Sequence, residues 1–182
     1  ILVNNAAAVH DQLAAPGNFW EKPIEVGNLI DVGVHSGYAA SWHAAQRMVR
    51  QDSGLIVFTS SPGGAHYCIG PAYGAHKAGM DKMAFDMAVD FREAGANVAA
   101  LSIWMGALLT DRLKNLIAAD TATYGYLLDQ VETPAFTGHI IWALFNDPKL
   151  LELSGTTLIG AELAVRYGIQ DDDGKQPPSF RD

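Results

Sequence analysis

Short apolar runs alternate along this chain with long stretches whose apolar residues recur at three- and four-residue steps. Residues 55–59 and 97–103 have the continuous apolar character of strands that are buried on both faces. Residues 23–51 and 71–93, which precede them, carry the helical pattern. Such alternation favours parallel strands joined by right-handed helical crossovers. The sequence therefore predicts an α/β fold with a doubly wound parallel sheet.

Shorter patterns extend the alternation in both directions. Residues 1–4 and 156–159 indicate further strands, and residues 108–119 and 133–146 indicate further helices. Neither an internal repeat nor a linker divides the sequence, so residues 1–182 are expected to form one domain. The apolar run at the first residue, without an initiator Met, has the pattern of a strand cut in the middle, and it suggests a portion of a longer protein.

Charge and composition exclude several classes of protein. A formal net charge of −8 and a pI near 5.1 disfavour a nucleic-acid partner or an anionic membrane surface. Apolar runs stay short of the roughly 20 residues that a membrane helix needs. The single cysteine, Cys68, excludes an intrachain disulfide and favours a reducing, cytoplasmic compartment. Six histidines lack ligand spacing, so no metal site is expected.

A tyrosine and a lysine stand four residues apart near the start of the second long helix, at Tyr73 and Lys77. This spacing places both side chains on one helix face. A phenol with a pKa of about 10 is a weak acid at neutral pH, and a neighbouring ammonium lowers that pKa. Ser60 lies thirteen residues before Tyr73, at the end of a predicted strand, where catalytic groups gather in such sheets. We expect these three residues to serve acid/base chemistry at a carbonyl oxygen, and Ser61 to be a turn or cap residue.

Four segments, taken in order, resemble the short-chain dehydrogenase/reductase family. Residues 2–7 are similar to its Asn-Asn-Ala-Gly segment, with Ala7 in place of Gly. Ser60, Tyr73 and Lys77 match its catalytic serine, tyrosine and lysine. Residues 105–110 are similar to its Pro-Gly-x-x-x-Thr turn, with Met105 in place of Pro, and residues 154–160 to its last strand. The resemblance implies a Rossmann-like domain that lacks its N-terminal part, the C-terminal two-thirds of a subunit.

The resemblance also implies roles for individual residues. Tyr73 would protonate the carbonyl oxygen, Lys77 would lower the Tyr73 pKa and hold the nicotinamide ribose, and Ser60 would orient the substrate carbonyl. Further cofactor contacts would come from Asn5, Ala6, Gly106, Leu108 and Thr110. The Gly-rich phosphate turn and the residue that selects NAD or NADP would precede residue 1, so the choice between NADP and NAD stays open.

One departure from the family pattern concerns a residue of the first long helix. The family usually has an Asn in a water-mediated proton relay where this chain has Gly33. We expect water or a backbone carbonyl to supply that relay here. His76, which lies between Tyr73 and Lys77, is expected to face away from the pocket.

Residues 19–23, 60–63, 102–104 and 163–168 are most similar to the family branch called dehydrogenase/reductase member 1, which implies an NADPH-linked carbonyl reductase. The sequence thus predicts an enzyme that moves hydride between NADP or NAD and a small carbonyl or alcohol substrate. The resemblance also implies a homodimer or homotetramer, with the two long helices at the interface. Two alternatives stay open: an inactive binding or scaffold protein of the same fold, and a remnant without dinucleotide binding.

Overall fold

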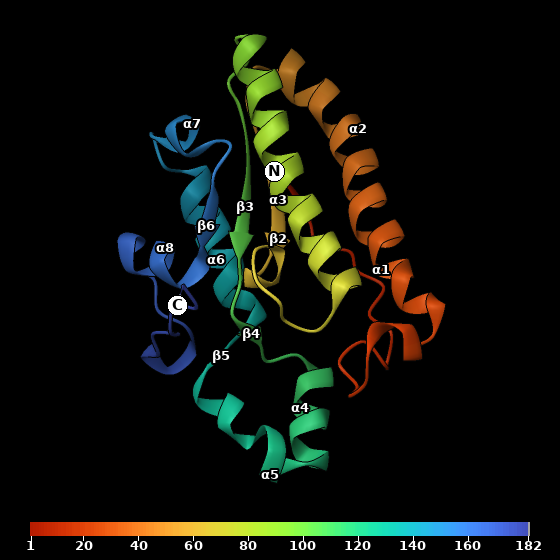
Figure 1. Ribbon diagram of the computed structural model, residues 1–182. Coiled ribbons are helices and arrows are strands. Elements are labelled where there is room, and N and C mark those ends of the chain that lie inside the picture. Colours follow the sequence, from red (N-terminus) through yellow and green to blue (C-terminus); the bar gives the residue numbers. More distant parts are fainter. Residues whose placement is uncertain (182) are drawn as a thin grey trace. The chain divides into compact units, whose positions relative to one another are not determined.

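The structure is a computed structural model that describes residues 1–181 (Figure 1). The chain divides into two compact units. The first unit comprises Ile1–Ile103 with Pro148–Thr157, and the second comprises Trp104–Asp147 with Leu158–Asp182. Each unit has buried apolar residues of its own. The residues predicted to carry the chemistry, Ser60, Tyr73 and Lys77, all belong to the first unit.

The main sheet has four strands, and most of their residues belong to the first unit. Their order in the sheet is β1-β2-β3-β6, with bounds Leu2–Asn4, Gly54–Ser60, Val98–Trp104 and Thr157–Ile159. β1 and β2 are parallel, and Val3 stands opposite Val57. Beyond β3 the sheet continues toward β6, because the Ser102 N–H donates to the Thr156 carbonyl oxygen at 3.1 Å. The predicted α/β class, with a parallel sheet flanked by helices, is confirmed.

Two long helices cover β1 and β2. They are α2 (Ser36–Arg50) and α3 (Pro71–Glu93), which contact each other and the strands (Figure 1). α3 has the predicted bounds. Gly95, with a φ of +65°, follows its end, where a left-handed backbone favours glycine. A short helix α7 (Leu150–Leu153) completes the unit.

The predicted helix over residues 23–51 is correct only for its second half. Residues 24–27 form a 3-10 turn, α1 covers Asn28–Ile30, and a π-helical turn at Asp31–His35 precedes α2. The apolar spacing still follows a helical period through this region, so the interruption was not visible in the sequence. In the π turn, a histidine from α3 occupies the space beside Gly33.

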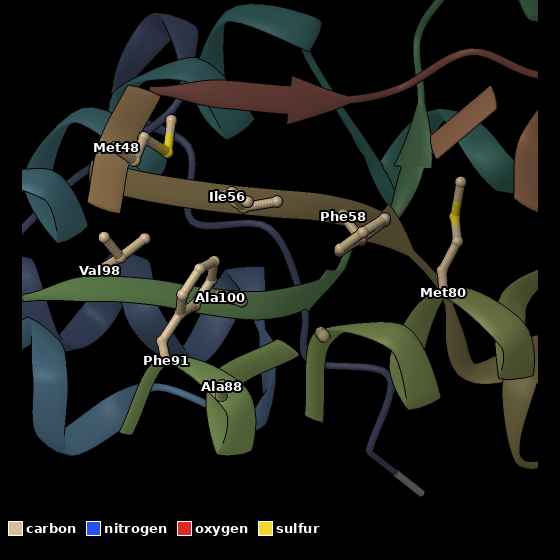
Figure 2. Packing of buried hydrophobic residues seen from close by; sticks show 9 residues of the cluster. Met48, Ile56, Phe58, Met80, Ala88, Phe91, Val98 and Ala100 are labelled. Carbon is tan, nitrogen blue, oxygen red and sulfur yellow. The ribbon is translucent and has the colours of Figure 1, made fainter. Parts of the chain in front are cut away.

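Apolar side chains from α2, α3, β2 and β3 form the core of the first unit (Figure 2). All residues of β2 are buried, as expected for a strand covered on both faces. The cluster combines Met48, Ile56, Phe58, Met80, Ala84, Ala88, Phe91, Val98 and Ala100. This packing holds β2 against α3, and the candidate catalytic residues lie at the carboxyl end of β2 and in the first turns of α3.

The second unit is built on a small parallel pair of strands, four α-helices and two 3-10 turns among the described residues. Its elements are β4 (Ala107–Leu108), α4 (Asp111–Ala119), α5 (Thr121–Tyr124), β5 (Val131–Glu132), α6 (Pro134–Phe145) and α8 (Gly160–Tyr167). The predicted start of α6 is confirmed, since the Thr133 hydroxyl accepts the Phe136 N–H at 3.2 Å and Pro134 follows at the first helical position. α8 was not predicted.

Candidate active site

The carboxyl end of β2 presents two consecutive serines in different surroundings. Ser60 is fully buried, and its hydroxyl donates to the main-chain carbonyl oxygen of Lys77 at 3.2 Å. Ser61 begins the 3-10 turn at Pro62–Gly64 and accepts the Gly63 N–H at 3.2 Å. The Tyr73 hydroxyl donates to the Ser61 hydroxyl oxygen at 2.8 Å. The structure therefore brings Ser61, rather than Ser60, to the tyrosine.

The first turns of α3 place Tyr73 and Lys77 as the sequence predicted. Gly70 precedes the helix with a φ of +125°, a conformation that glycine adopts readily, and Pro71 occupies the first position. The Lys77 ammonium nitrogen lies 5.6 Å from the centroid of the Tyr73 ring. It donates to the carbonyl oxygen of Thr59 at 2.9 Å, which anchors it at the end of β2.

Burial shifts the acidity of both groups. It lowers the pKa of the Lys77 ammonium to about 8, against the smaller opposing effect of the Asp81 carboxylate. It raises the pKa of the Tyr73 phenol, and the hydrogen bond with Ser61 only partly offsets this. The prediction that the Tyr73 pKa lies below its usual value is therefore wrong for this structure. Lys77 lies beside the ring and bonds to a carbonyl oxygen, while desolvation of the phenolate dominates.

The loop after β1 lies beside the same strand end. The hydroxyl of Thr59, in β2, donates to the Asn5 side-chain oxygen at 2.7 Å and to the Asn4 carbonyl oxygen at 3.2 Å. Asn4 is buried, and its amide donates to the Ser41 hydroxyl of α2 at 2.9 Å. Asn5 and the following Ala6 are exposed, so this loop offers a polar side chain of fixed orientation to a ligand.

Gly33 and His76 pack directly against each other. A Cβ at position 33 would lie 2.0 Å from the His76 Nε2 atom, well inside contact distance. The His76 side chain is fully buried, and neither ring nitrogen has a hydrogen-bond partner in the part of the chain that the structure describes. Burial, and then the neighbouring Lys77 charge, lower the pKa of His76 to about 4. A neutral imidazole thus fills the space beside the π turn.

The predicted cofactor residues Gly106, Leu108 and Thr110 belong to the second unit. A Cβ at Gly106 would approach the Glu132 Oε2 atom to 2.8 Å, so glycine allows this close approach. Leu108 is half-buried in β4. Thr110 is exposed, and its hydroxyl accepts the Leu113 N–H at 3.3 Å as the cap of α4.

The described residues, 1–181, also bear on a membrane span and on a metal site. None of the helices in this range is both long and apolar enough to cross a membrane. In the same range, no three side chains of His, Cys, Asp or Glu gather closely enough to hold a metal ion.

Comparison with known proteins places these observations in a family. A sequence model described as short chain dehydrogenase matches residues 1–121. The human protein called dehydrogenase/reductase SDR family member 1 is 37% identical over 185 aligned positions, which cover 96% of this chain and 58% of the human protein. The mouse protein of the same name is 36% identical with the same coverage. This chain thus spans 58% of the length of these relatives.

Solved structures share the fold at lower identity. The structure called ElxO with NADP bound has a TM-score of 0.73 and 22% identity, and the match covers 90% of this chain and 66% of that one. A 3-oxoacyl-[acyl-carrier protein] reductase from Brucella melitensis with bound NAD has a TM-score of 0.67 and 18% identity, and the match covers 86% and 58% of the two chains. At these identities the likeness shows the fold alone.

Proposed function

Because the chain belongs to the short chain dehydrogenase family, we propose that it is a nicotinamide-dependent oxidoreductase acting on a carbonyl or hydroxyl carbon. The observation that carries the proposal is the group formed by Tyr73, Ser61 and Lys77. The phenol donates to a serine hydroxyl oxygen at 2.8 Å, and a buried ammonium lies beside its ring. A proton donor, an orienting hydroxyl and a nearby positive charge are what carbonyl reduction requires of a protein.

The residues present suit a nicotinamide cofactor. An ammonium has three N–H donors, and Lys77 commits one to the Thr59 carbonyl oxygen, which leaves donors for ribose hydroxyls. Asn5 and Ala6 are proposed to line the adenosine-ribose side, and Gly106, Leu108 and Thr110 to contact the nicotinamide end. The bound cofactor supplies the hydride. NADPH is proposed from the branch resemblance of the sequence alone, and NADH is the alternative.

The protein's own residues supply the proton that the carbonyl oxygen receives during reduction. When a carbonyl carbon receives hydride, its oxygen takes the phenol proton of Tyr73 and an alcohol forms. The remaining phenolate is stabilised by the Lys77 ammonium, whose charge matters most at this moment. Ser61 donates its hydroxyl hydrogen to the substrate oxygen and holds it beside Tyr73. Oxidation of an alcohol runs through the same groups in reverse.

The test is Tyr73→Phe, assayed by NADPH and NADH oxidation with a panel of aldehydes and ketones. We expect a loss of turnover of at least about 100-fold, since a positioned general acid contributes on this scale. Tyr126→Phe, which alters an exposed tyrosine of the second unit, is the matched control and keeps the activity. Turnover that survives Tyr73→Phe would overturn the mechanism. A wild-type protein that binds NADPH but reduces nothing would favour the scaffold alternative.

Self-association is part of this proposal. α2 and α3 carry large apolar side chains that face water, among them Tyr38, Trp42 and Phe85, each more than half exposed. These exposed apolar side chains support an interface that includes α2 and α3. Trp42→Glu is expected to lower the molar mass measured by light scattering. An unchanged mass would place the interface elsewhere.

A further inference from the structure

A buried glutamate ends the strand β5 of the second unit. Glu132 is 1% exposed, and its Oε1 atom accepts the Thr137 hydroxyl at 3.4 Å. Its Oε2 atom lacks a hydrogen-bond partner among residues 1–181. Burying a carboxylate with incomplete partners costs free energy, and an apolar side chain of similar volume is often more stable in such a place. Residues that break the rules of stability in this way are expected at functional sites.

The main chain at Glu132 fixes one part of the segment 106–110, which is proposed to contact the nicotinamide end of the cofactor. In the parallel pair of β4 and β5, Leu108 stands opposite Glu132. The Leu109 N–H donates to the Glu132 carbonyl oxygen at 2.9 Å. The Thr110 N–H donates to the Leu108 carbonyl oxygen at 2.7 Å. Residues 108–110 therefore take their position from the end of β5.

The side chain of Glu132 meets the other part of this segment, at Gly106. A Cβ at position 106 would lie 2.8 Å from the Glu132 Oε2 atom and 3.0 Å from the Phe180 Cε2 atom, so the glycine backbone packs closely against a carboxylate and a ring. Desolvation raises the pKa of Glu132, and the Gly106 N–H, which faces the carboxylate, opposes this shift. Glu132 thus contacts the segment twice, through its carboxylate and through its main chain.

We infer that Glu132 is a positioning residue, which holds residues 106–110 in the shape that receives the nicotinamide end of the cofactor. The inference rests on the proposed function, because that proposal assigns Gly106, Leu108 and Thr110 to the nicotinamide end. It adds a residue that touches neither the substrate nor the reacting atoms, and that belongs to none of the motifs in the sequence.

A carboxylate suits this task better than a neutral side chain. It has two oxygens that both accept hydrogen bonds, so one can face the Gly106 N–H while the other accepts the Thr137 hydroxyl. Hydrogen bonds to a charged acceptor are stronger than those between neutral groups. A misplacement of about 1 Å can cost about 100-fold in rate, so a rigid support for the cofactor outweighs its cost in stability.

Glu132→Leu tests this role, because it removes both carboxylate oxygens and keeps a side chain of comparable size. The Kd is measured by calorimetry for NADPH and for 2′-phospho-ADP-ribose, which is the same dinucleotide without its nicotinamide ring. We expect the Kd of NADPH to rise about tenfold, which corresponds to about 1.4 kcal/mol, and the Kd of 2′-phospho-ADP-ribose to stay unchanged. Glu152→Leu, at an exposed site, is the matched control and changes neither Kd.

Thr137→Val provides a second variant, which keeps the inference testable if Glu132→Leu does not fold. It removes the hydroxyl that holds Oε1 and is expected to raise the Kd of NADPH about threefold, with 2′-phospho-ADP-ribose again unaffected. In the Glu132→Leu background, Thr137→Val is expected to add nothing further, because the two side chains act as one unit. Additive effects would show that Thr137 acts without Glu132.

Amide hydrogen exchange of Gly106 supplies a readout without any cofactor. We expect the Gly106 N–H to exchange about tenfold faster in Glu132→Leu and at the wild-type rate in Glu152→Leu. An unchanged exchange rate together with an unchanged Kd of NADPH would overturn the inference. Equal weakening of NADPH and 2′-phospho-ADP-ribose would also overturn it, since that result indicates a general loss of structure.

The same measurements separate the inference from the proposed function. A wild-type protein that binds neither ligand would refute the proposed function, and the exchange of Gly106 would then decide alone whether Glu132 holds the segment. A wild-type protein that binds NADPH, with the same Kd in Glu132→Leu, would refute the inference and leave the proposed function standing.

Discussion

The imidazole of His76 occupies the space that a side chain at Gly33 would need, with Nε2 only 2.0 Å from the position of the missing Cβ. Gly33 lies in the π-helical turn before α2, and His76 lies in α3 between the two candidate catalytic residues. π-helical turns recur at functional sites. The glycine that departs from the family pattern is therefore explained by its neighbour, and the two positions form one packing unit.

Gly33→Asn is expected to lower the free energy of unfolding by about 1–3 kcal/mol, because the new side chain overpacks a filled space. Adding His76→Ala is expected to recover most of that loss, since it empties the space. Denaturant titration of the wild type, both single variants and the double variant measures the coupling. Gly138→Asn, at an open position, is the control. Additive effects of the two substitutions would show that the residues do not share this space.

Burial of neutral His76 makes stability depend on pH. Its pKa is about 4 in the folded protein, below its usual value near 6.5, so the unfolded chain binds more protons between these values. Stability is therefore expected to fall as the pH falls from about 6.5 to 4, by up to about 3 kcal/mol from this group. His76→Gln is expected to remove this contribution to the pH dependence of the free energy of unfolding, which is measured by urea titration at each pH. His139→Gln, at an exposed site, keeps it. Equal slopes in both variants would contradict the prediction.

The two serines at the end of β2 are expected to respond differently to substitution. Ser61→Ala removes the hydroxyl beside Tyr73 and is expected to lower kcat/KM about 100-fold. It also removes the hydrogen bond that opposes the raised Tyr73 pKa, so the basic limb of the pH–rate profile moves upward. Ser60→Ala is expected to cost about 1 kcal/mol of stability, through the lost bond to the Lys77 carbonyl, with kcat/KM nearly intact. The opposite pattern would restore Ser60 as the orienting residue.

Glu132 is expected to limit the stability of the second unit. It is buried, its Oε2 atom lacks a partner among the described residues, and desolvation followed by the Asp171 charge raises its pKa against hydrogen bonds from Gly106 and Thr137. A raised carboxyl pKa means that stability falls as the pH rises through the interval between the unfolded and folded pKa values. Glu132→Gln is expected to raise the melting temperature at pH 7, whereas Glu152→Gln, at an exposed site, does not. A lower melting temperature would show that the carboxylate stabilises the fold.

Local patterns in the sequence were sufficient for the class of fold and for one relationship between candidate catalytic residues. Continuous apolar runs such as β2 identify buried strands, because a strand covered on both faces has no polar side. Tyr73 and Lys77 share a helix face because four residues make about one turn. The bounds of α3 followed from Pro71 and Gly95. The backbone preference of proline favours the start of a helix, and that of glycine favours the position just after its end.

Only the tertiary structure decided which serine meets Tyr73 and what surrounds His76. Successive residues of an extended chain point in opposite directions, so Ser60 turns into the core and Ser61 turns toward Tyr73. The loop before α3 is compatible with a distance of either thirteen or twelve residues between the serine and Tyr73, so the sequence alone does not choose between the two serines. The helical period determines on which face of α3 the His76 side chain lies, but it does not determine which other element packs against that face. The π turn and Gly33 fill that side. Such contacts depend on long-range packing, which local periodicity does not encode.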